Sequence, residues 1–341
     1  MIQQHKLGEL CEIKKGNSIT RDKINEGNVP VIAGGQQPAY YHNESNRTGE
    51  TITISASGAY AGFVNYFNIP IFASDCSTIQ SKQNNIFMKY VYYFLKSNQS
   101  RIYKMQKGIA QPHVYPKDLA QVRIPLPPLP AQKAIVKILE QAEKLKQKRE
   151  EADKLTQEYL KSVFYEMFLK DKKFNLKKGK ELFELVYGKG LSDKERDGGK
   201  YQVYGSNGVV GGHSEFLIKG PGIIIGRKGS IGEVNYSKEN FWPIDTTYYI
   251  RALKEMNFIY LYYLLKSYNL KLNSSTAIPG LNRNEVYSID FIDAPLNLQQ
   301  KFAKIMEKVE KMKDNQKKSK EKIDELFNSL MQKAFRGELV R

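Results

Sequence analysis

The chain carries the stretch PLPAQKAIVKILE at residues 128–140 and a related stretch, PLNLQQKFAKIME, at residues 295–307. Each begins with proline and continues into a long segment, 131–169 or 298–336, that has neither glycine nor proline. Proline suits the first turn of a helix, and apolar residues recur in both segments at spacings of three, four or seven. The sequence therefore predicts two long helices with the same beginning.

The similarity extends outward from these helices to most of the chain. The other repeated stretches are ELCEIKKGNSIT at 9–20 with ELFELVYGKGLS at 181–192, YVYYFLKS at 90–97 with YLYYLLKS at 260–267, and AQPHV at 110–114 with AIPGL at 277–281. The order is the same in both halves, and the offset drifts only from 172 to 167. Such a repeat indicates two similar half-molecules, each a globular domain followed by a long helix.

We predict an α+β fold in which two similar globular domains alternate with two long helices. Short β-like runs punctuated by glycine, asparagine and proline fill the globular parts. The predicted segments are 1–127, the first globular domain; 128–170, the central helix; 171–294, the second globular domain; and 295–341, the C-terminal helix.

The apolar pattern of the two helices predicts that they pair as an antiparallel coiled coil, in a pseudo-twofold internal repeat. The predicted seam consists of Ile135, Ile138, Ala142, Leu145, Arg149, Phe302, Ile305, Val309, Met312, Gln316 and Ile323. Its two polar members, Arg149 and Gln316, either form a layer that fixes the register or lie at the edge of the seam. A helix of this length spans about 50 Å, which would hold the two globular domains well apart.

The composition favours a nucleic-acid partner. The 341 residues have a formal net charge of +17, and asparagine, glutamine and tyrosine are frequent, although a lysine-rich proteome would also give a basic chain. Residues 131–170 hold nine basic and seven acidic side chains, and residues 298–336 hold eleven and six, so most of the excess lies outside the helices.

The cysteines and the hydropathy place the chain in a reducing, aqueous compartment. Cys11 and Cys76 are the only cysteines, so neither a disulfide framework nor a zinc site is indicated. The first residues lack the apolar core of a signal peptide, and no apolar run is long enough for a membrane span. We expect a cytoplasmic protein that makes no contact with a membrane.

The order of these motifs resembles that of the specificity subunits of type I restriction-modification enzymes. The resemblance rests on the two helix beginnings, on the domain beginnings KLGELCEIKKG at 6–16 and KELFELVYGKG at 180–190, and on the ending LMQKAFRGEL at 330–339. It covers nearly the whole chain, although the chain is short for the family and Asn297 replaces a second proline.

The resemblance implies a non-catalytic subunit in which two target-recognition domains each read one half of a split, asymmetric sequence of double-stranded DNA. It implies that the helices form a spacer and bind two modification subunits, which methylate adenine. It also implies restriction subunits that translocate and cut DNA. S-adenosylmethionine, ATP and Mg²⁺ would then be used by these partners, and this chain would hold no cofactor and no metal.

We expect DNA contacts from basic and amide side chains in the polar, glycine-rich connections of both domains. The candidates are Lys15, Asn17, Gln36, Gln37, Tyr40, Ser57, Tyr60, Lys107, Gln111, Lys189, Ser206, Asn207, His213, Arg227, Lys228, Asn282 and Arg283. For each one, a solvated loop residue is the alternative. The tyrosines of 90–93 and 260–263 are expected to pack in the core and not to stack on bases, because apolar residues alternate with them.

Two other functions stay open at this point. Glu12-x-Lys14 occurs in metal-dependent nucleases, but a lysine-rich chain produces such a pair by chance, and the four histidines show no metal-ligand spacing. A coiled-coil adaptor without a DNA role is the second alternative, and the basic globular parts argue against it. The stretch PGIIIGRKGS at 221–230 has the wrong glycine spacing for a phosphate-binding loop.

Overall fold

The structure is a computed structural model that describes residues 3–108, 110–170, 174–268, 270 and 280–339. The chain divides into two compact units, one formed by Met1–Glu150 with Lys317–Arg341 and the other by Glu151–Gln316. Each unit therefore contains one globular domain and parts of both long helices. The predicted α+β class with two similar domains is confirmed; the predicted domain boundaries stay a prediction, and residues 277–279 of the AIPGL motif lie outside the described residues.

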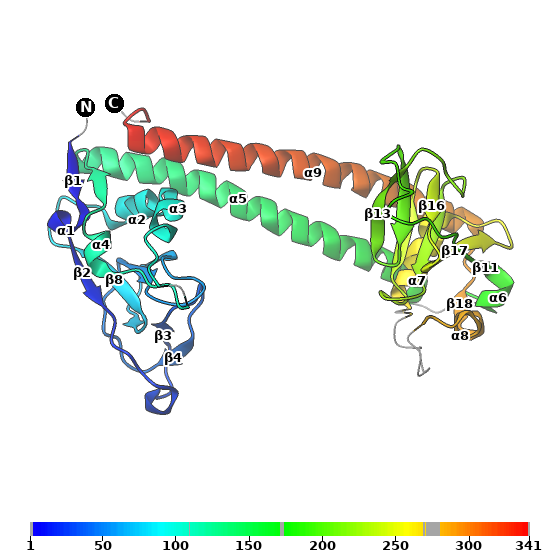
Figure 1. Ribbon diagram of the computed structural model, residues 1–341, viewed down its shortest axis with the longest axis horizontal. Coiled ribbons are helices and arrows are strands. Elements are labelled where there is room, and N and C mark those ends of the chain that lie inside the picture. Colours follow the sequence, from blue (N-terminus) through cyan, green and yellow to red (C-terminus); the bar gives the residue numbers. More distant parts are fainter. Residues whose placement is uncertain (1–2, 109, 171–173, 269, 271–279, 340–341) are drawn as a thin grey trace. The chain divides into compact units, whose positions relative to one another are not determined.

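The first unit is built on two antiparallel or mixed sheets and one strand pair (Figure 1). Its strands are β1 (Gln4–Lys6), β2 (Cys11–Lys15), β3 (Val29–Ile32), β4 (Tyr40–His42), β5 (Thr51–Ser55), β6 (Val64–Phe67), β7 (Phe72–Ala73), β8 (Cys76–Ser81) and β9 (Arg123–Pro125). The four-stranded sheet has the order β2-β8-β5-β6, the three-stranded sheet has the order β4-β3-β7, and β1 pairs with β9. Its helices are α1 (Leu7–Leu10), a 3-10 turn at Arg21–Lys23, α2 (Met88–Ser97), α3 (Gln99–Tyr103) and α4 (Pro116–Leu119).

The second unit repeats this plan strand for strand. Its strands are β10 (Leu176–Lys178), β11 (Phe183–Tyr187), β12 (Tyr201–Gly205), β13 (Gly208–His213), β14 (Gly222–Gly226), β15 (Val234–Ser237), β16 (Phe241–Pro243), β17 (Thr247–Ala252) and β18 (Asp290–Ile292). The sheets have the orders β11-β17-β14-β15 and β13-β12-β16, and β10 pairs with β18. The short helices are α6 (Gly179–Leu182), α7 (Phe258–Ser267) and α8 (Arg283–Ser288). The predicted internal repeat is therefore present in the fold.

The two long helices are α5 (Leu129–Phe164), which continues as a π-helical turn at Tyr165–Leu169, and α9 (Leu296–Arg336). In the first unit the beginning of α5 packs antiparallel against the end of α9, with Leu139 and Ala142 in one core with Phe327 and Met331. The ion pair between Lys146 and Asp324, 2.7 Å apart, crosses the same contact.

In the second unit the end of α5 packs against the beginning of α9. Phe164 and Phe168 each lie with their ring centroids 5.4 Å from that of Phe302. Gln316 donates a hydrogen bond of 2.9 Å to the hydroxyl of Thr156, so its polar group has a partner on the facing helix. Both units thus show the antiparallel pairing that the apolar pattern predicted.

Two positions of the predicted seam are less buried than expected. Leu145 is 45% exposed in the first unit and Met312 is 41% exposed in the second, whereas Val136 and Leu139, outside the predicted seam, are almost fully buried. The reason is that each helix packs on a globular domain as well as on the other helix. Its buried face therefore points between the two and not only toward the other helix. Lys146 takes part of the place of Leu145, because its ammonium lies 5.2 Å from the ring centroid of Phe327.

A buried glutamine joins each long helix to its globular domain. The side chain of Gln132 accepts a hydrogen bond from the backbone of Phe87, 2.9 Å away, and donates to the carbonyls of Asn85 and Pro127. Gln299 accepts from the backbone of Asn257 at 2.8 Å. Both glutamines follow the proline that precedes their helix, and both are almost fully buried. The recurring motif therefore fixes where each helix begins on its domain.

The tyrosine-rich helices α2 and α7 pack inward, as predicted. Tyr90 and Tyr260 are fully buried, and their hydroxyls donate to the carbonyls of Pro125 and Ile292, each at 2.7 Å. In the first unit Glu143 also accepts from the hydroxyl of Tyr93, 2.7 Å away. Tyr90, Tyr93 and Tyr260 are thus core residues with satisfied hydroxyls, whereas Tyr92, Tyr262 and Tyr263 are half-buried.

Candidate nucleic-acid interface

In the first unit, five connections meet at one end of the four-stranded sheet. We call residues 16–18, 34–37, 56–60, 74–75 and 110–113 loop cluster 1. The backbone joins them: the amide of Asn17 donates to the carbonyl of Ala73 at 2.8 Å, and the amide of Val114 donates to that of Ala56 at 3.0 Å. These hydrogen bonds bring together segments that are far apart in the sequence.

Most of the candidates of the first domain lie in or beside loop cluster 1. Lys15, Asn17, Gln36, Gln37, Tyr60, Lys107 and Gln111 are exposed. The side chain of Asn65 donates to the carbonyl of Gln36 at 3.0 Å, and the hydroxyl of Ser57 donates to Asp75. Lys107 already pairs with Asp118 at 2.8 Å, so part of its charge is balanced within the domain.

Tyr40 lies on strand β4 of the three-stranded sheet and not in a connection. Its ring is 42% exposed, and the guanidinium of Arg21 lies 5.9 Å from the ring centroid. Sequence reasoning grouped Tyr40 with the loops because it follows a glycine-rich stretch, but the pairing of β3 with β4 places it on a strand.

The corresponding connections of the second unit form loop cluster 2, which consists of residues 188–190, 206–207, 227–230, 245–246 and 280–283. The amide of Arg227 donates to the carbonyl of Thr246 at 2.9 Å, and the amide of Leu281 donates to the carbonyl of Arg227 at the same distance. Ser206 lies beside this turn, because a Cβ on Gly229 would be 3.4 Å from its hydroxyl. The candidates Ser206, Arg227, Lys228 and Arg283 are therefore neighbours.

Arg227 is held by its own domain. Its Nε and Nη2 atoms donate to the carbonyl of Asp245 at 3.3 and 2.8 Å. Its guanidinium lies 5.2 Å from the ring centroid of Tyr187 and 5.9 Å from that of Tyr248. The guanidinium of Arg283 lies 5.7 Å from the same Tyr187 ring. We call these four residues the arginine–tyrosine cluster.

The two tyrosines of this cluster differ in exposure. Tyr187 is 51% exposed and Tyr248 only 3%, and their ring centroids are 5.0 Å apart. Burial, assisted by a hydrogen bond with Tyr187, raises the pKa of Tyr248 to about 12. Its phenol is therefore neutral at physiological pH and adds no negative charge beside the two arginines.

Two other candidates of the second domain, His213 and Lys189, have structural contacts. His213 is mostly buried against Trp242, with ring centroids 5.5 Å apart, and its Nδ1 lies 3.3 Å from the carboxylate of Asp197. Hydrogen bonds from Ser214 and Gly199 lower the pKa of Asp197 to about 2. Lys189 also contacts Trp242, because its ammonium lies over the ring, 5.8 Å from the centroid.

The remaining two candidates lie at turns. Asn207 is exposed between β12 and β13. The side chain of Asn282 accepts a hydrogen bond of 3.0 Å from the backbone of Asn284 and so caps helix α8. An amide that is used as a helix cap is less available for base edges than a free one.

The two loop clusters have the same backbone arrangement but different side chains at equivalent positions. The pairing of β2 with β8 sets Lys15 opposite Ser77, and the pairing of β11 with β17 sets Tyr187 opposite Tyr248. Ala56 occupies the place of Arg227, because each accepts the equivalent backbone hydrogen bond. In the first unit, where Ala56 and Ser77 are small, a cavity of about 320 Å³ is lined by Lys15, Ala56, Ser77, His113 and Tyr115, among others.

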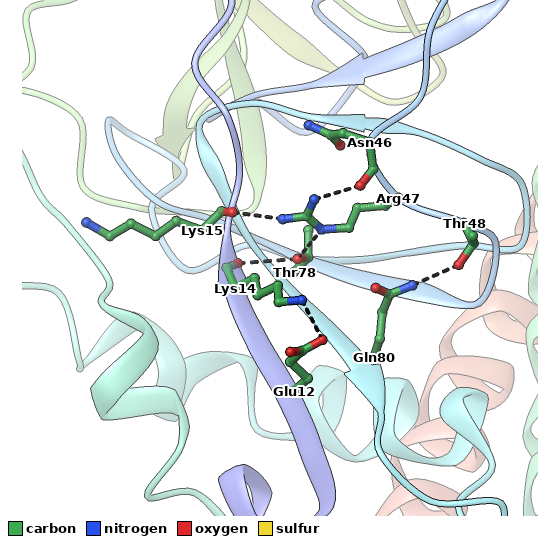
Figure 2. A network of polar contacts seen from close by, with 8 residues as sticks. All are labelled: Glu12, Lys14, Lys15, Asn46, Arg47, Thr48, Thr78 and Gln80. Atoms are coloured by element: carbon green, nitrogen blue, oxygen red, sulfur yellow. Dashed lines mark hydrogen bonds and ion pairs between the residues drawn. The ribbon is translucent and has the colours of Figure 1, made fainter.

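Figure 2 shows how the backbone of Lys15 is fixed. The guanidinium of Arg47 donates to the carbonyl of Lys15 at 2.8 Å and to the hydroxyl of Thr78 at the same distance. The Lys15 side chain points away from this network (Figure 2). The backbone of strand β2 is thus held at Lys15, while the ammonium group of Lys15 stays exposed.

The Glu12–Lys14 pair lies beside the Arg47 network, because the hydroxyl of Thr78 donates a hydrogen bond of 3.3 Å to the carbonyl of Lys14 (Figure 2). The two side chains contact each other at 2.8 Å on the exposed face of β2 (Figure 2). Within the described residues, no group of three or more histidine, cysteine or acidic side chains is placed to hold a metal ion. In the same part of the chain, no helix has the length and apolar character needed to span a bilayer.

Sequence reasoning missed Tyr187 and Tyr248, which support Arg227. Neither tyrosine was among the candidates, because their contact with an arginine depends on the pairing of β11 with β17. The available signal was an arginine after a buried glycine-rich strand, but no spacing rule links it to Tyr187, 40 positions earlier.

Known proteins resemble the chain in sequence. A profile of the type I restriction modification DNA specificity domain matches twice, over residues 2–156 and 171–325. The MjaVIII specificity subunit of Methanocaldococcus jannaschii is 27% identical over 301 residues, which cover 84% of this chain and 62% of that protein. The MpnII specificity subunit of Mycoplasma pneumoniae is 31% identical over 150 residues, 42% of this chain and 44% of that protein. The matches thus span about half the length of the curated relatives from Mycoplasma pneumoniae.

Solved structures resemble the chain in fold. The S subunit of a type I restriction-modification system from M. genitalium superposes with a TM-score of 0.68 at 21% identity, over 98% of this chain and 96% of that one. A chain from a study of the assembly and conformational transition of the type I R-M system gives 0.65 at 15% identity, over 99% and 98%. Since the family profile covers both halves, the chain belongs to the family of type I restriction modification DNA specificity domains.

Proposed function

We propose that the chain is the DNA-recognition subunit of a type I restriction-modification complex, with one half of a bipartite, asymmetric target read by each globular domain. The observation that carries this is the pair of loop clusters. They lie at equivalent places of two similar domains, yet one has a cavity beside Ala56 and the other has the arginine–tyrosine cluster. Two readers with different side chains suit a target with two different halves.

Charge supports DNA as the ligand. The sequence has a net charge of +17, and loop cluster 2 presents Lys189, Arg227, Lys228 and Arg283 around a single acidic residue, Asp245. Lysine and arginine side chains at phosphates supply most of the sequence-independent affinity for DNA. The exposed amides of Gln36, Gln37 and Gln111 add groups that hydrogen-bond to base edges.

We further propose that the chain docks two modification subunits, and restriction subunits where they exist, through the paired long helices. The exposed faces of α5 and α9 are rich in charged residues, which suits recognition by partners. In this proposal, adenine methylation and DNA cleavage, with their S-adenosylmethionine, ATP and Mg²⁺, belong to the partner subunits. The chain itself has no catalytic role.

The test is to express the chain with its modification subunit and to map methylated adenines in the host DNA. We expect methylation at one sequence made of two short specific blocks separated by unread base pairs. A methylated sequence with a single uninterrupted block would contradict the bipartite proposal. Cleavage of plasmid DNA by the purified chain with Mg²⁺ alone would contradict the non-catalytic role.

A further inference from the structure

The side chain of Arg227 has one edge engaged and one edge available. A guanidinium carries five N–H donors in a fixed plane. The Nε–Nη2 edge of Arg227 binds the carbonyl of Asp245, and among the described residues no hydrogen bond involves Nη1. The end of the half-buried group, where one N–H of Nη1 runs parallel to one N–H of Nη2, therefore keeps two parallel donors.

The cluster holds this fork in place before any ligand arrives. The backbone of Arg227 is fixed on both sides by Thr246 and Leu281, and its guanidinium lies over Tyr187 and Tyr248. Such stacking reduces the rotamer freedom that binding would otherwise remove. A side chain that only neutralises phosphate does not need this arrangement, and exposed Lys228 lies next to it for that role.

The charge of the cluster calls for a hydrogen-bond acceptor. Arg227 and Arg283 approach the ring of Tyr187 together, and in the described part of the chain no carboxylate lies within ion-pair distance of either guanidinium. In the major groove only guanine offers two acceptors, O6 and N7, to a pair of parallel donors; adenine offers one acceptor and one donor.

We propose that Arg227 reads a guanine in the half-site of the second domain, through O6 and N7 in the major groove. Tyr187 is its positioning residue. The first domain has Ala56 at the equivalent place and uses other side chains, so this contact belongs to one half-site only. The inference rests on the proposed function, since it names one base of the target that the proposed function requires.

The experiment selects bound sequences from duplexes with two randomised blocks, using the full chain in complex with its modification subunits. The wild-type complex should enrich a two-block sequence with a guanine in one block. Arg227→Ala should reduce the preference for that guanine by roughly 5- to 150-fold and leave the other block unchanged. Arg227→Lys, which keeps the charge without the planar fork, should lose the same preference while retaining most of the affinity.

Two further variants identify the cause. Tyr187→Leu should weaken the guanine preference in part, because the fork would lose its support. Arg251→Ala is the matched control: this exposed arginine of the same domain pairs with Glu184 at 2.9 Å, away from loop cluster 2, and its loss should leave the selected sequence unchanged.

Other results would overturn the inference. If Arg227→Ala weakens binding to all sequences equally and lowers the salt dependence, Arg227 contacts a phosphate. A wild-type sequence without guanine in the second block, or an unchanged preference in Arg227→Ala, would also overturn it while leaving the proposed function intact. If the wild-type complex enriches no sequence, the proposed function itself fails.

Discussion

At the scale of single residues, the buried glutamines show how a short motif fixes a domain to a helix. Gln299 lies at the beginning of α9 with 1% of its surface exposed and satisfies the backbone of Asn257, which caps helix α7. The next residue, Gln300, is exposed. The two neighbours therefore offer a direct comparison of one side chain in two environments.

We expect Gln299→Ala to lower the free energy of unfolding of the second unit by about 1–3 kcal/mol, because it leaves a buried backbone donor without an acceptor. Urea unfolding followed by the fluorescence of Trp242, the one tryptophan of the sequence, reports on this unit. Gln300→Ala should change the stability by less than about 0.5 kcal/mol. Equal effects of the two changes would mean that the hydrogen bonds of Gln299 do not matter.

Glu143 makes the stability of the first unit depend on pH. Burial alone would raise the pKa of Glu143, but hydrogen bonds from Tyr93 and Lys96 and the charges of Lys96 and Lys146 lower it below its ordinary value of 4.5. The folded state therefore favours the ionised form more than the unfolded state does. The stabilisation from Glu143 is present above this ordinary value and is lost as the pH falls through the folded pKa.

We expect Glu143→Gln to destabilise the first unit at neutral pH and to flatten its loss of stability in acid. Hydrogen exchange of residues 88–97, measured from about pH 6 to about pH 4, follows this unit alone. Glu310→Gln is the control, because Glu310 occupies the equivalent place in the second unit, and among the described residues its ion pair is with Lys313, three residues along its own helix. Parallel pH profiles for wild type and Glu143→Gln would disprove the assignment.

At the scale of elements, the long helices were the part that the sequence predicted best. Their proline-led beginnings, their lack of glycine and their apolar spacing are local properties, and α5 and α9 follow them closely. The face that each helix buries was less predictable. It depends on the globular domain, which covers Val136 and Leu139 and leaves Leu145 exposed.

The candidate site was predicted less completely than the helices. Composition selected loops that the fold brings together, since residues as distant as Asn17, Ser57 and Gln111 lie in loop cluster 1; their contact with DNA stays a prediction. It did not separate His213 and Asn282, whose side chains have partners inside the domain, from Arg227. It also missed Tyr187, because a cross-strand neighbour is set by sheet register and not by distance along the chain.

The helices also allow a test of the spacer. Inserting four residues, about one turn, at equivalent positions of both helices, within 140–155 and 307–322, should lengthen the spacer by about 6 Å. We expect the unread part of the DNA target to grow by about two base pairs while both specific blocks keep their sequences. Methylation mapping measures both quantities. Replacing four residues there without insertion should leave the spacing unchanged, and altered blocks after insertion would count against a spacer role.

At the scale of the whole molecule, each globular domain is completed by the end of the helix that begins at the other domain. Phe335, near the end of α9, packs on Tyr90 and Phe94 of the first domain with ring centroids 5.4 and 5.3 Å apart. Phe168, after α5, packs on Tyr260 of the second domain at 4.8 Å. The two phenylalanines are 167 positions apart, the same offset as the helix beginnings.

We expect Phe335→Ala to destabilise only the first unit and Phe168→Ala only the second. Fully buried Phe168 should cost about 3–5 kcal/mol, and partly buried Phe335 less. Hydrogen exchange of 88–97 and of 258–267, measured in both variants, separates the two units. Faster exchange in both helices after either change would show that the units unfold together.

The crossed helix ends also bear on how the protein is made. The second unit, Glu151–Gln316, is one uninterrupted stretch that can fold as soon as it leaves the ribosome, whereas the first unit also needs Lys317–Arg341, which are synthesised after the whole second unit. Until Phe335 has been synthesised, the aromatic face of α2 lacks its cover. The nascent first domain, although its synthesis begins first, is therefore completed after the second, and in the interval it leaves part of its core uncovered.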